Sequence, residues 1–179
     1  LRRIWTSYNI PPRLINARLT NYYPQNDQQL SALQRCCAYA VNGLENIMNG
    51  CGLFFEGPVG TGKTHLAVAT VYEIVASNIL LFGNQGLKKE TSVYGHYYYE
   101  GIQCFFASVV ELLDAIRSSY HEGREGYKKI HGMIMRARND ELVILDDLGA
   151  EKPTDWVEEQ LYGLIDYRYR NKLCTFFTT

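Results

Sequence analysis

Apolar residues recur along the chain in two spacings, which predict helices alternating with short strands. Helical spacing predicts five helices, over 30–47, 63–75, 109–116, 127–137 and 157–165. Short apolar runs predict strands at 51–57, 102–106, 142–147 and 173–179. The run at 142–147 is continuous rather than alternating, which is typical of a parallel strand buried on both faces. This order predicts an α/β fold with a mainly parallel sheet.

Polar residues at the expected helix starts predict how these helices are capped. Each pair stands at N-cap and N3 spacing: Asn26 with Gln29, Ser108 with Glu111, and Asp155 with Glu158.

A glycine-rich stretch lies between the first predicted strand and the following helix. Residues 57–64, Gly-Pro-Val-Gly-Thr-Gly-Lys-Thr, fit the P-loop pattern G-x-x-x-x-G-K-[ST] in the strand-loop-helix context that this pattern requires. The glycines let backbone N–H groups turn around a phosphate, and the helix amino end adds its dipole. We expect nucleotide contacts along the whole loop and its first helical residues: Gly57, Pro58, Val59, Gly60, Thr61, Gly62, Lys63, Thr64 and His65.

Within this loop, three side chains have distinct expected roles. Lys63 is expected to reach the β- and γ-phosphates as a catalytic cation, and the Thr64 hydroxyl to bind Mg²⁺. The backbone N–H of His65 can reach the α-phosphate, whereas its imidazole is expected to be structural. An ordinary glycine turn is the alternative.

Two acidic residues end the buried strand at 142–147. Asp146 is the expected Mg²⁺ ligand, directly or through water, since open α/β sheets place ligands at the carboxyl ends of their strands. Asp147 is the expected catalytic residue that orients or deprotonates an attacking water. The alternative is a solvated acidic turn, because Asp-Asp-Leu-Gly is also good turn chemistry.

Composition narrows the class of protein. The 179 residues are 46% hydrophobic and 21% charged, with a formal net charge of −1, so a globular domain without a global basic field is expected. The five cysteines form no CxxC pair, which favours free thiols in a reducing compartment. No apolar run is long enough to span a bilayer. We therefore expect a cytoplasmic protein without a membrane partner.

Four stretches carry a resemblance to a known family: GPVGTGKTHLAVAT, LVILDDLGAEKPTDW, IDYRYRNK and the terminal FFTT, together with IPPRLINARLTNYYPQNDQQ upstream. They resemble the AAA+ ATPase domain of bacterial DnaC-type and DnaI-type replicative helicase loaders, and the related IstB-type transposition ATPases share much of the pattern. The resemblance implies a P-loop NTPase of the ASCE class, with three α/β/α layers. It matches 57–64 to Walker A and 142–147 to Walker B, and places 10–19 near the adenine.

The chain departs from this family pattern at its carboxyl end. Relatives read Thr-Thr-Asn where this sequence stops at Thr179, so the sensor asparagine, the arginine finger and the lid domain are missing, and ATP hydrolysis is expected to be weak. The interpretation is a flank with a helix over 1–50 and a partial AAA+ core over 51–179, truncated after the fourth strand and interrupted by an insertion at about 78–101.

The insertion and a basic segment are the remaining candidates for contacts. The insertion concentrates tyrosines beside charge, as a platform for single-stranded DNA, a docking arm, or simply a hairpin packing on the domain: Lys88, Lys89, Tyr94, His96, Tyr97, Tyr98 and Tyr99. The basic segment could contact DNA phosphates or be a solvated helix face: Arg117, Arg124, Lys128, Lys129, Arg136 and Arg138.

Together, the motifs and the resemblance imply an ATPase that uses ATP/ADP and Mg²⁺ to control a hexameric replicative helicase and single-stranded DNA, with self-assembly of its AAA+ domains. Three alternatives remain open: an IstB-type ATPase acting with a transposase, a small-molecule P-loop kinase, and a nucleotide-gated adaptor that does not hydrolyse ATP.

Overall fold

The computed structural model describes residues 6–82, 90–91, 97–98, 102–119 and 124–179. Four parallel strands form one sheet in the order β1-β6-β5-β4: β1 (Leu53–Phe55), β6 (Cys174–Thr178), β5 (Leu142–Asp146) and β4 (Cys104–Ser108). The predicted α/β class with a parallel sheet is therefore confirmed.

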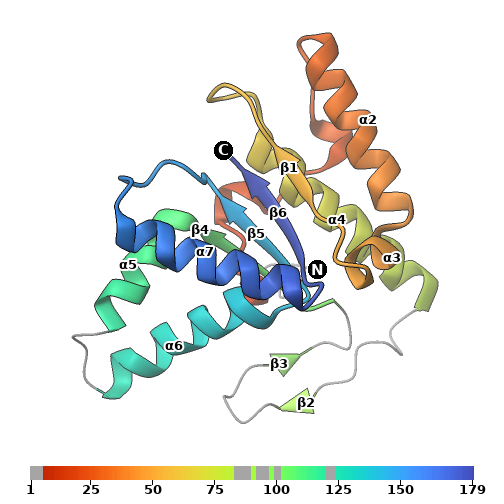
Figure 1. Cartoon of the computed structure of the whole chain (residues 1–179). Coiled ribbons are helices and arrows are strands. Elements are labelled where there is room, and N and C mark those ends of the chain that lie inside the picture. The colour runs from red at the N-terminus through yellow and green to blue at the C-terminus, as the bar shows by residue number, and fades with distance from the viewer. Residues whose placement is uncertain (1–5, 83–89, 92–96, 99–101, 120–123) are drawn as a thin grey trace.

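Helices cover both faces of this sheet (Figure 1). One face carries α2 (Asp27–Val41), α3 (Gly43–Met48) and α4 (Lys63–Phe82), and the other carries α5 (Val109–Ser119), α6 (Arg124–Asn139) and α7 (Asp155–Arg170). Two short 3-10 helices precede them, η1 (Pro12–Leu14) and η2 (Leu19–Asn21). The result is the expected arrangement of three layers.

Alternate residues of the central strands enter two separate cores. In β5, Leu142 and Ile144 pack with α2 and α4, whereas Val143 and Leu145 pack with α5, α6 and α7. All four are fully buried. The uninterrupted apolar sequence of this strand follows directly from its position between two helical layers.

The expected long helix over 30–47 is divided in two. Asn42 ends α2, and Gly43 begins α3. A Cβ on Gly43 would lie 2.4 Å from Cγ1 of Ile74, so the glycine lets α3 approach α4 closely. Helical periodicity continues across the break and therefore did not reveal it.

Helix starts differ in part from the predicted caps. Asn26 caps α2 as expected, accepting from the backbone N–H of Gln29 at 2.9 Å. The α7 cap is Thr154 rather than Asp155, because the Thr154 hydroxyl accepts from the N–H of Val157 at 3.3 Å. Asp155 instead lies in the first turn, where its carboxylate complements the helix dipole. Ser108 is the last residue of β4, paired with Asp146, and it directly precedes Val109, where α5 begins, so it stands at the predicted N-cap position.

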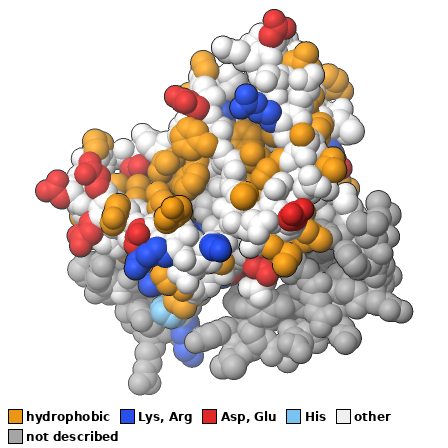
Figure 2. All heavy atoms as spheres, turned by 45° about the vertical axis from the view of Figure 1, so that its right-hand side comes forward, with side chains coloured by type: hydrophobic (Ala, Val, Ile, Leu, Met, Phe, Trp, Pro, Cys, Tyr) orange, Lys and Arg blue, Asp and Glu red, His pale blue; other side chains and the backbone are white. Residues whose placement is uncertain are grey.

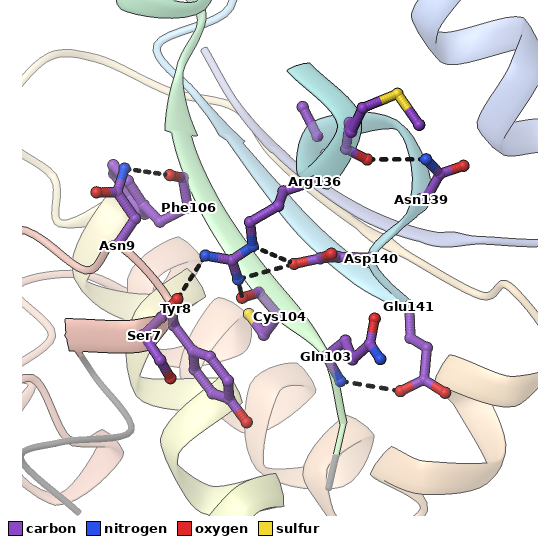
Figure 3. Close-up of polar contacts among 12 residues, drawn as sticks. Ser7, Tyr8, Asn9, Gln103, Cys104, Phe106, Arg136, Asn139, Asp140 and Glu141 are labelled. Atoms are coloured by element: carbon purple, nitrogen blue, oxygen red, sulfur yellow. Dashed lines mark hydrogen bonds and ion pairs between the residues drawn. The ribbon is translucent and has the colours of Figure 1, made fainter. Parts of the chain in front are cut away.

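The amino-terminal segment covers the outer edge of β4. The Tyr8 carbonyl accepts from the Phe106 N–H at 2.8 Å, and the Asn9 side-chain amide donates to the Phe106 carbonyl at 3.0 Å (Figure 3). Tyr8 also donates through its hydroxyl to the carbonyl of Ile102 at 2.7 Å. These bonds occupy backbone groups that an edge strand would otherwise expose.

The Tyr-rich insertion is described only in part. Its strands β2 (Glu90–Thr91) and β3 (Tyr97–Tyr98) pair antiparallel. Lys88, Lys89, Tyr94, His96 and Tyr99 lie outside the described residues, so the choice between a DNA platform, a docking arm and a packing hairpin stays a prediction. Helix α4 continues to Phe82, past the predicted start of the insertion.

Candidate functional site

The glycine-rich loop joins the carboxyl end of β1 to the amino end of α4. Gly60 and Gly62 have φ values of 83° and 87°, which side chains with a Cβ rarely adopt. Gly62 is also held close to Tyr22, since an added Cβ would lie 2.6 Å from the ring atom Cε2. The side chain of Val59 is 99% exposed, which places the loop apex at the surface.

The loop is closed by hydrogen bonds among its own residues. The Lys63 ammonium donates to the carbonyls of Gly57 at 2.9 Å and Pro58 at 3.0 Å. The Thr61 hydroxyl donates to the Pro58 carbonyl at 2.9 Å. Lys63 is the first residue of α4, so its charge lies where the helix dipole already favours an anion. Hydrogen-bond donors and positive potential are thus concentrated at the carboxyl end of β1.

Asp146 is the last residue of β5, at the same carboxyl-terminal end of the parallel strands. Its side chain is buried, 3% exposed, and its Oδ1 accepts from the Thr178 hydroxyl at 2.7 Å. Burial raises the pKa of Asp146, while hydrogen bonds from the hydroxyls of Thr178 and Thr64 oppose that rise. The structure therefore brings together Thr64 and Asp146, two residues that the sequence singled out 82 positions apart.

Asp147 follows with an exposed side chain and an unusual backbone. Its φ of 57° lies in the left-handed region, which costs a non-glycine residue about 1 kcal/mol. Its N–H donates to the Thr178 hydroxyl at 2.9 Å. Asp146 and Asp147 consequently face different environments, one inside the sheet edge and one in solvent.

The amino-terminal segment supports the glycine-rich loop from outside. The Tyr22 hydroxyl donates to the Thr61 carbonyl at 2.8 Å. The ring of His65 lies 5.7 Å from that of Tyr22, and its Nε2 bonds to the Arg18 carbonyl at 3.0 Å. The Arg18 guanidinium stacks on Tyr72 of α4, 3.3 Å from the ring centroid. The expected structural role of the His65 imidazole agrees with this contact.

Two residues of this site were not identified from the sequence. Thr178 lies in the quoted FFTT run, but nothing in that run indicates that its hydroxyl meets the acidic pair. Tyr22 lies in a Tyr-Tyr doublet, 39 positions from its bonding partner Thr61. No spacing rule connects such distant segments, so only the fold reveals both contacts.

Three residues of the basic segment, among the four whose side chains the structure describes, make contacts within the chain. Arg136 binds Asp140 at 2.8 Å and donates to the carbonyls of Ser7 at 2.5 Å and Cys104 at 2.6 Å (Figure 3). Arg138 stacks on Tyr167 at 3.9 Å, and Arg117 on Trp156 at 4.9 Å.

Lys128 is exposed, while the side chains of Arg124 and Lys129 lie outside the described set. The face in Figure 2 carries charges of both signs among apolar patches, rather than a continuous basic surface. Arg136 is therefore engaged within the chain, and the choice between DNA contact and a solvated helix face stays a prediction for the rest of the segment.

The cysteines are free thiols, as expected. Cys36, Cys104 and Cys174 are buried, and Cys37 and Cys51 are exposed. Of the adjacent pair, Cys36 thus faces the core and Cys37 does not. Among the described residues, no helix combines the length and apolar character that crossing a membrane requires.

Solved structures of replication proteins share this fold. The crystal structure of the DnaC helicase loader matches over 94% of this chain and 79% of its own, with a TM-score of 0.68 and 30% identity. DnaI matches over 94% and 74%, with a TM-score of 0.63 and 22% identity. AMPPCP-bound DnaA from Aquifex aeolicus matches over 92% and 42%, with a TM-score of 0.59 and 15% identity, which shows the fold alone.

No protein-family model and no curated protein sequence matches the chain. The identity and coverage of the DnaC match nevertheless exceed what a shared fold alone explains, and they agree with the order of sequence motifs. This chain belongs to the DnaC/DnaI-type helicase loader family of AAA+ domains.

Proposed function

We propose that this domain binds ATP with Mg²⁺ and hydrolyses it. The observation that carries the proposal is the meeting of Thr64, at the start of α4, with the buried carboxylate of Asp146, at the end of β5. Around this point the loop supplies left-handed glycines, a helix amino end and the Lys63 cation. A phosphate chain and its metal need these same groups in one place.

The donor set fits Mg²⁺. The Thr64 hydroxyl and the Asp146 carboxylate are hard oxygen ligands, which Mg²⁺ prefers, and they leave positions for water and phosphate oxygens. When bound, the ion would neutralise charge that develops on the transferring phosphate. Burial of Asp146 supports this assignment, because a buried carboxylate gains from a nearby cation.

Lys63 and Asp147 take the catalytic roles. Lys63 now bonds to two loop carbonyls, and its ammonium can exchange these neutral acceptors for β- and γ-phosphate oxygens, which are stronger acceptors. Asp147 stands next to the metal ligand with its side chain in solvent, where it can orient or deprotonate a water. Gly57, Pro58, Val59, Gly60, Thr61, Gly62 and the backbone of His65 complete the proposed nucleotide contacts.

We infer a role in replication from the family. DnaC is named as a helicase loader, and a solved structure of DnaA contains AMPPCP and single-stranded DNA. We propose that the present chain uses its ATP cycle to control a hexameric replicative helicase and single-stranded DNA, with AAA+ domains assembling together. Residues 51–179 form the proposed ATPase core, and 1–50 form the flank that leads into it.

Nucleotide binding is tested by removing the cation. A fluorescent ATP analogue should bind Lys63→Ala at least about tenfold more weakly than the parent, because a charge-assisted hydrogen bond is lost. Lys128→Ala removes an exposed cation on α6 and should leave the affinity unchanged. Equal affinity of Lys63→Ala and the parent would overturn the proposal.

Hydrolysis and partner need separate measurements. Phosphate release without an added acceptor distinguishes an ATPase from a kinase or a non-hydrolysing adaptor, and Asp147→Asn should reduce it about 100-fold or more. Capture with purified hexameric helicase, in ATP and Mg²⁺, tests the loader role. In a parallel capture, binding of a transposase but not of the helicase would favour the IstB-type alternative.

A further inference from the structure

Thr178 occupies the end of β6, between the two strands that carry the proposed site. It is paired with Phe55 of β1 on one side, and β6 adjoins β5 on the other. Its side chain is fully buried. Among the described strands, β6 alone separates β1, which leads into the glycine-rich loop, from β5, which ends in the acidic pair.

Three hydrogen bonds join Thr178 to the acidic pair and its turn. Its hydroxyl donates to Asp146 Oδ1 at 2.7 Å and accepts from the Asp147 N–H at 2.9 Å. Its carbonyl accepts from the Leu148 N–H at 2.7 Å. A hydroxyl has one proton, so donation to Asp146 fixes its direction and leaves a lone pair for Asp147. One side chain therefore holds both the position of the Asp146 carboxylate and the backbone conformation of Asp147.

The backbone of Asp147 requires such support. A φ of 57° is unfavourable for aspartate, and an unfavourable conformation persists where surrounding contacts determine it. The bonds to Asp147 and Leu148 hold two successive N–H groups of this turn against β6. Without them the turn can relax, and the Asp147 carboxylate would move relative to Asp146.

We propose that Thr178 is a positioning residue for ATP hydrolysis, which holds the metal ligand Asp146 and the catalytic Asp147 in register with the glycine-rich loop. This rests on the proposed function. Thr178 acts through the two aspartates and needs no contact with the nucleotide. Its loss should therefore lower turnover and the response to Mg²⁺, while metal-free nucleotide binding persists.

Three variants separate this role from a structural one. Thr178→Val removes the hydroxyl at constant shape, Thr178→Ser keeps it, and Thr178→Ala removes both the hydroxyl and the γ-methyl group. Thr70→Val is the control, because the Thr70 hydroxyl is equally buried but donates to the Leu66 carbonyl within α4, at 2.7 Å. Thermal unfolding selects variants that fold.

The readouts are phosphate release at varied ATP, and binding of a fluorescent nucleotide with and without Mg²⁺. Thr178→Val or Thr178→Ala should lower kcat by about tenfold or more, since a hydrogen bond to a charged group is lost. Both should reduce the tightening of nucleotide binding by Mg²⁺. Thr178→Ser should stay within about threefold of the parent, because its hydroxyl can make the same bonds. Thr70→Val should match the parent.

The failure of this inference is distinct from that of the proposed function. A folded Thr178→Val or Thr178→Ala with parental kcat and parental Mg²⁺ response would overturn the positioning role. A parent chain that binds nucleotide but releases no phosphate would overturn hydrolysis instead. In that case the Mg²⁺ response still decides whether Thr178 holds Asp146.

Discussion

The buried guanidinium of Arg168 should carry a large share of the stability of the second core. Its side chain, on α7, is 1% exposed. It donates to five groups from two segments, 137–140 and 174–175: the Thr175 hydroxyl at 2.9 Å and the carbonyls of Ala137 at 3.1 Å, Arg138 at 3.3 Å, Asp140 at 2.9 Å and Cys174 at 2.6 Å. Arg168 thereby satisfies carbonyls at the end of α6 that have no partner within the helix.

The cost of removing this group follows from the acceptors left behind. Burial lowers the pKa of Arg168 to about 10, which still leaves the guanidinium charged at neutral pH. Arg168→Met keeps much of the apolar volume but leaves several buried acceptors unsatisfied, each worth about 1–3 kcal/mol. Water can reach some of them, so we expect a total loss of about 3–5 kcal/mol, a large fraction of typical domain stability.

Urea unfolding measures this loss directly. Arg168→Met should shift the midpoint strongly, and Arg168→Lys should fall between it and the parent, because an ammonium has fewer donors than the five of a guanidinium. Arg170→Met is the matched control on the same helix. Its ion pair with Asp166 is exposed, at 69% and 31%, so it should cost less than about 1 kcal/mol. A similar, small loss in Arg168→Met and Arg170→Met would refute the reasoning.

Two further predictions concern the glycine-rich loop and the Arg136–Asp140 pair. Gly62→Ala should weaken binding of a fluorescent nucleotide more than Gly60→Ala: both have positive φ, but only Gly62 would bring a Cβ to 2.6 Å from Tyr22, whereas Gly60 meets open space. Equal affinities would contradict this. Burial raises the pKa of Asp140 in the folded chain, against the opposing effect of Arg136. Protonation of Asp140 therefore stabilises the fold fully below pH 3.8, and this contribution is lost as the pH rises through the pKa of the folded chain. The unfolding free energy of the parent relative to Asp140→Asn should therefore decrease between pH 4 and pH 7, and a constant or increasing difference would contradict the assignment.

The sequence predicted what depends on local pattern. Continuous apolar residues in 142–146 identified the central strand, because burial between two helical layers leaves no polar face. The glycine spacing of 57–62 identified the loop, because backbone conformation there depends on local residue type. Asp146 and Thr64 each followed from their positions in these motifs, and parallel topology explains why the ends of β1 and β5 lie at the same sheet edge.

Contacts between distant segments could not be predicted in this way. Arg168 appeared as one of several charges on an amphipathic helix, where an exposed position is the usual expectation. In the sequence, Arg136 was likewise one of the cations of the basic segment, although its guanidinium joins α6 to Ser7 and Cys104. A charge pattern gives the number of cations on a helix, but only the packing shows which of them bond to other groups of the same chain.

The same distinction explains how the proposed ATP site is held together. The sequence motifs supply the groups that would meet phosphate and metal, but their relative position depends on residues outside those motifs. Tyr22 holds the glycine-rich loop at Thr61 from the amino-terminal side, and Thr178 holds the acidic pair from β6. Because these supports come from different segments, a movement of either segment would displace one half of the site against the other. Each support is a direct hydrogen bond to a residue of the proposed site, so either segment can change the geometry of the site without contacting the nucleotide.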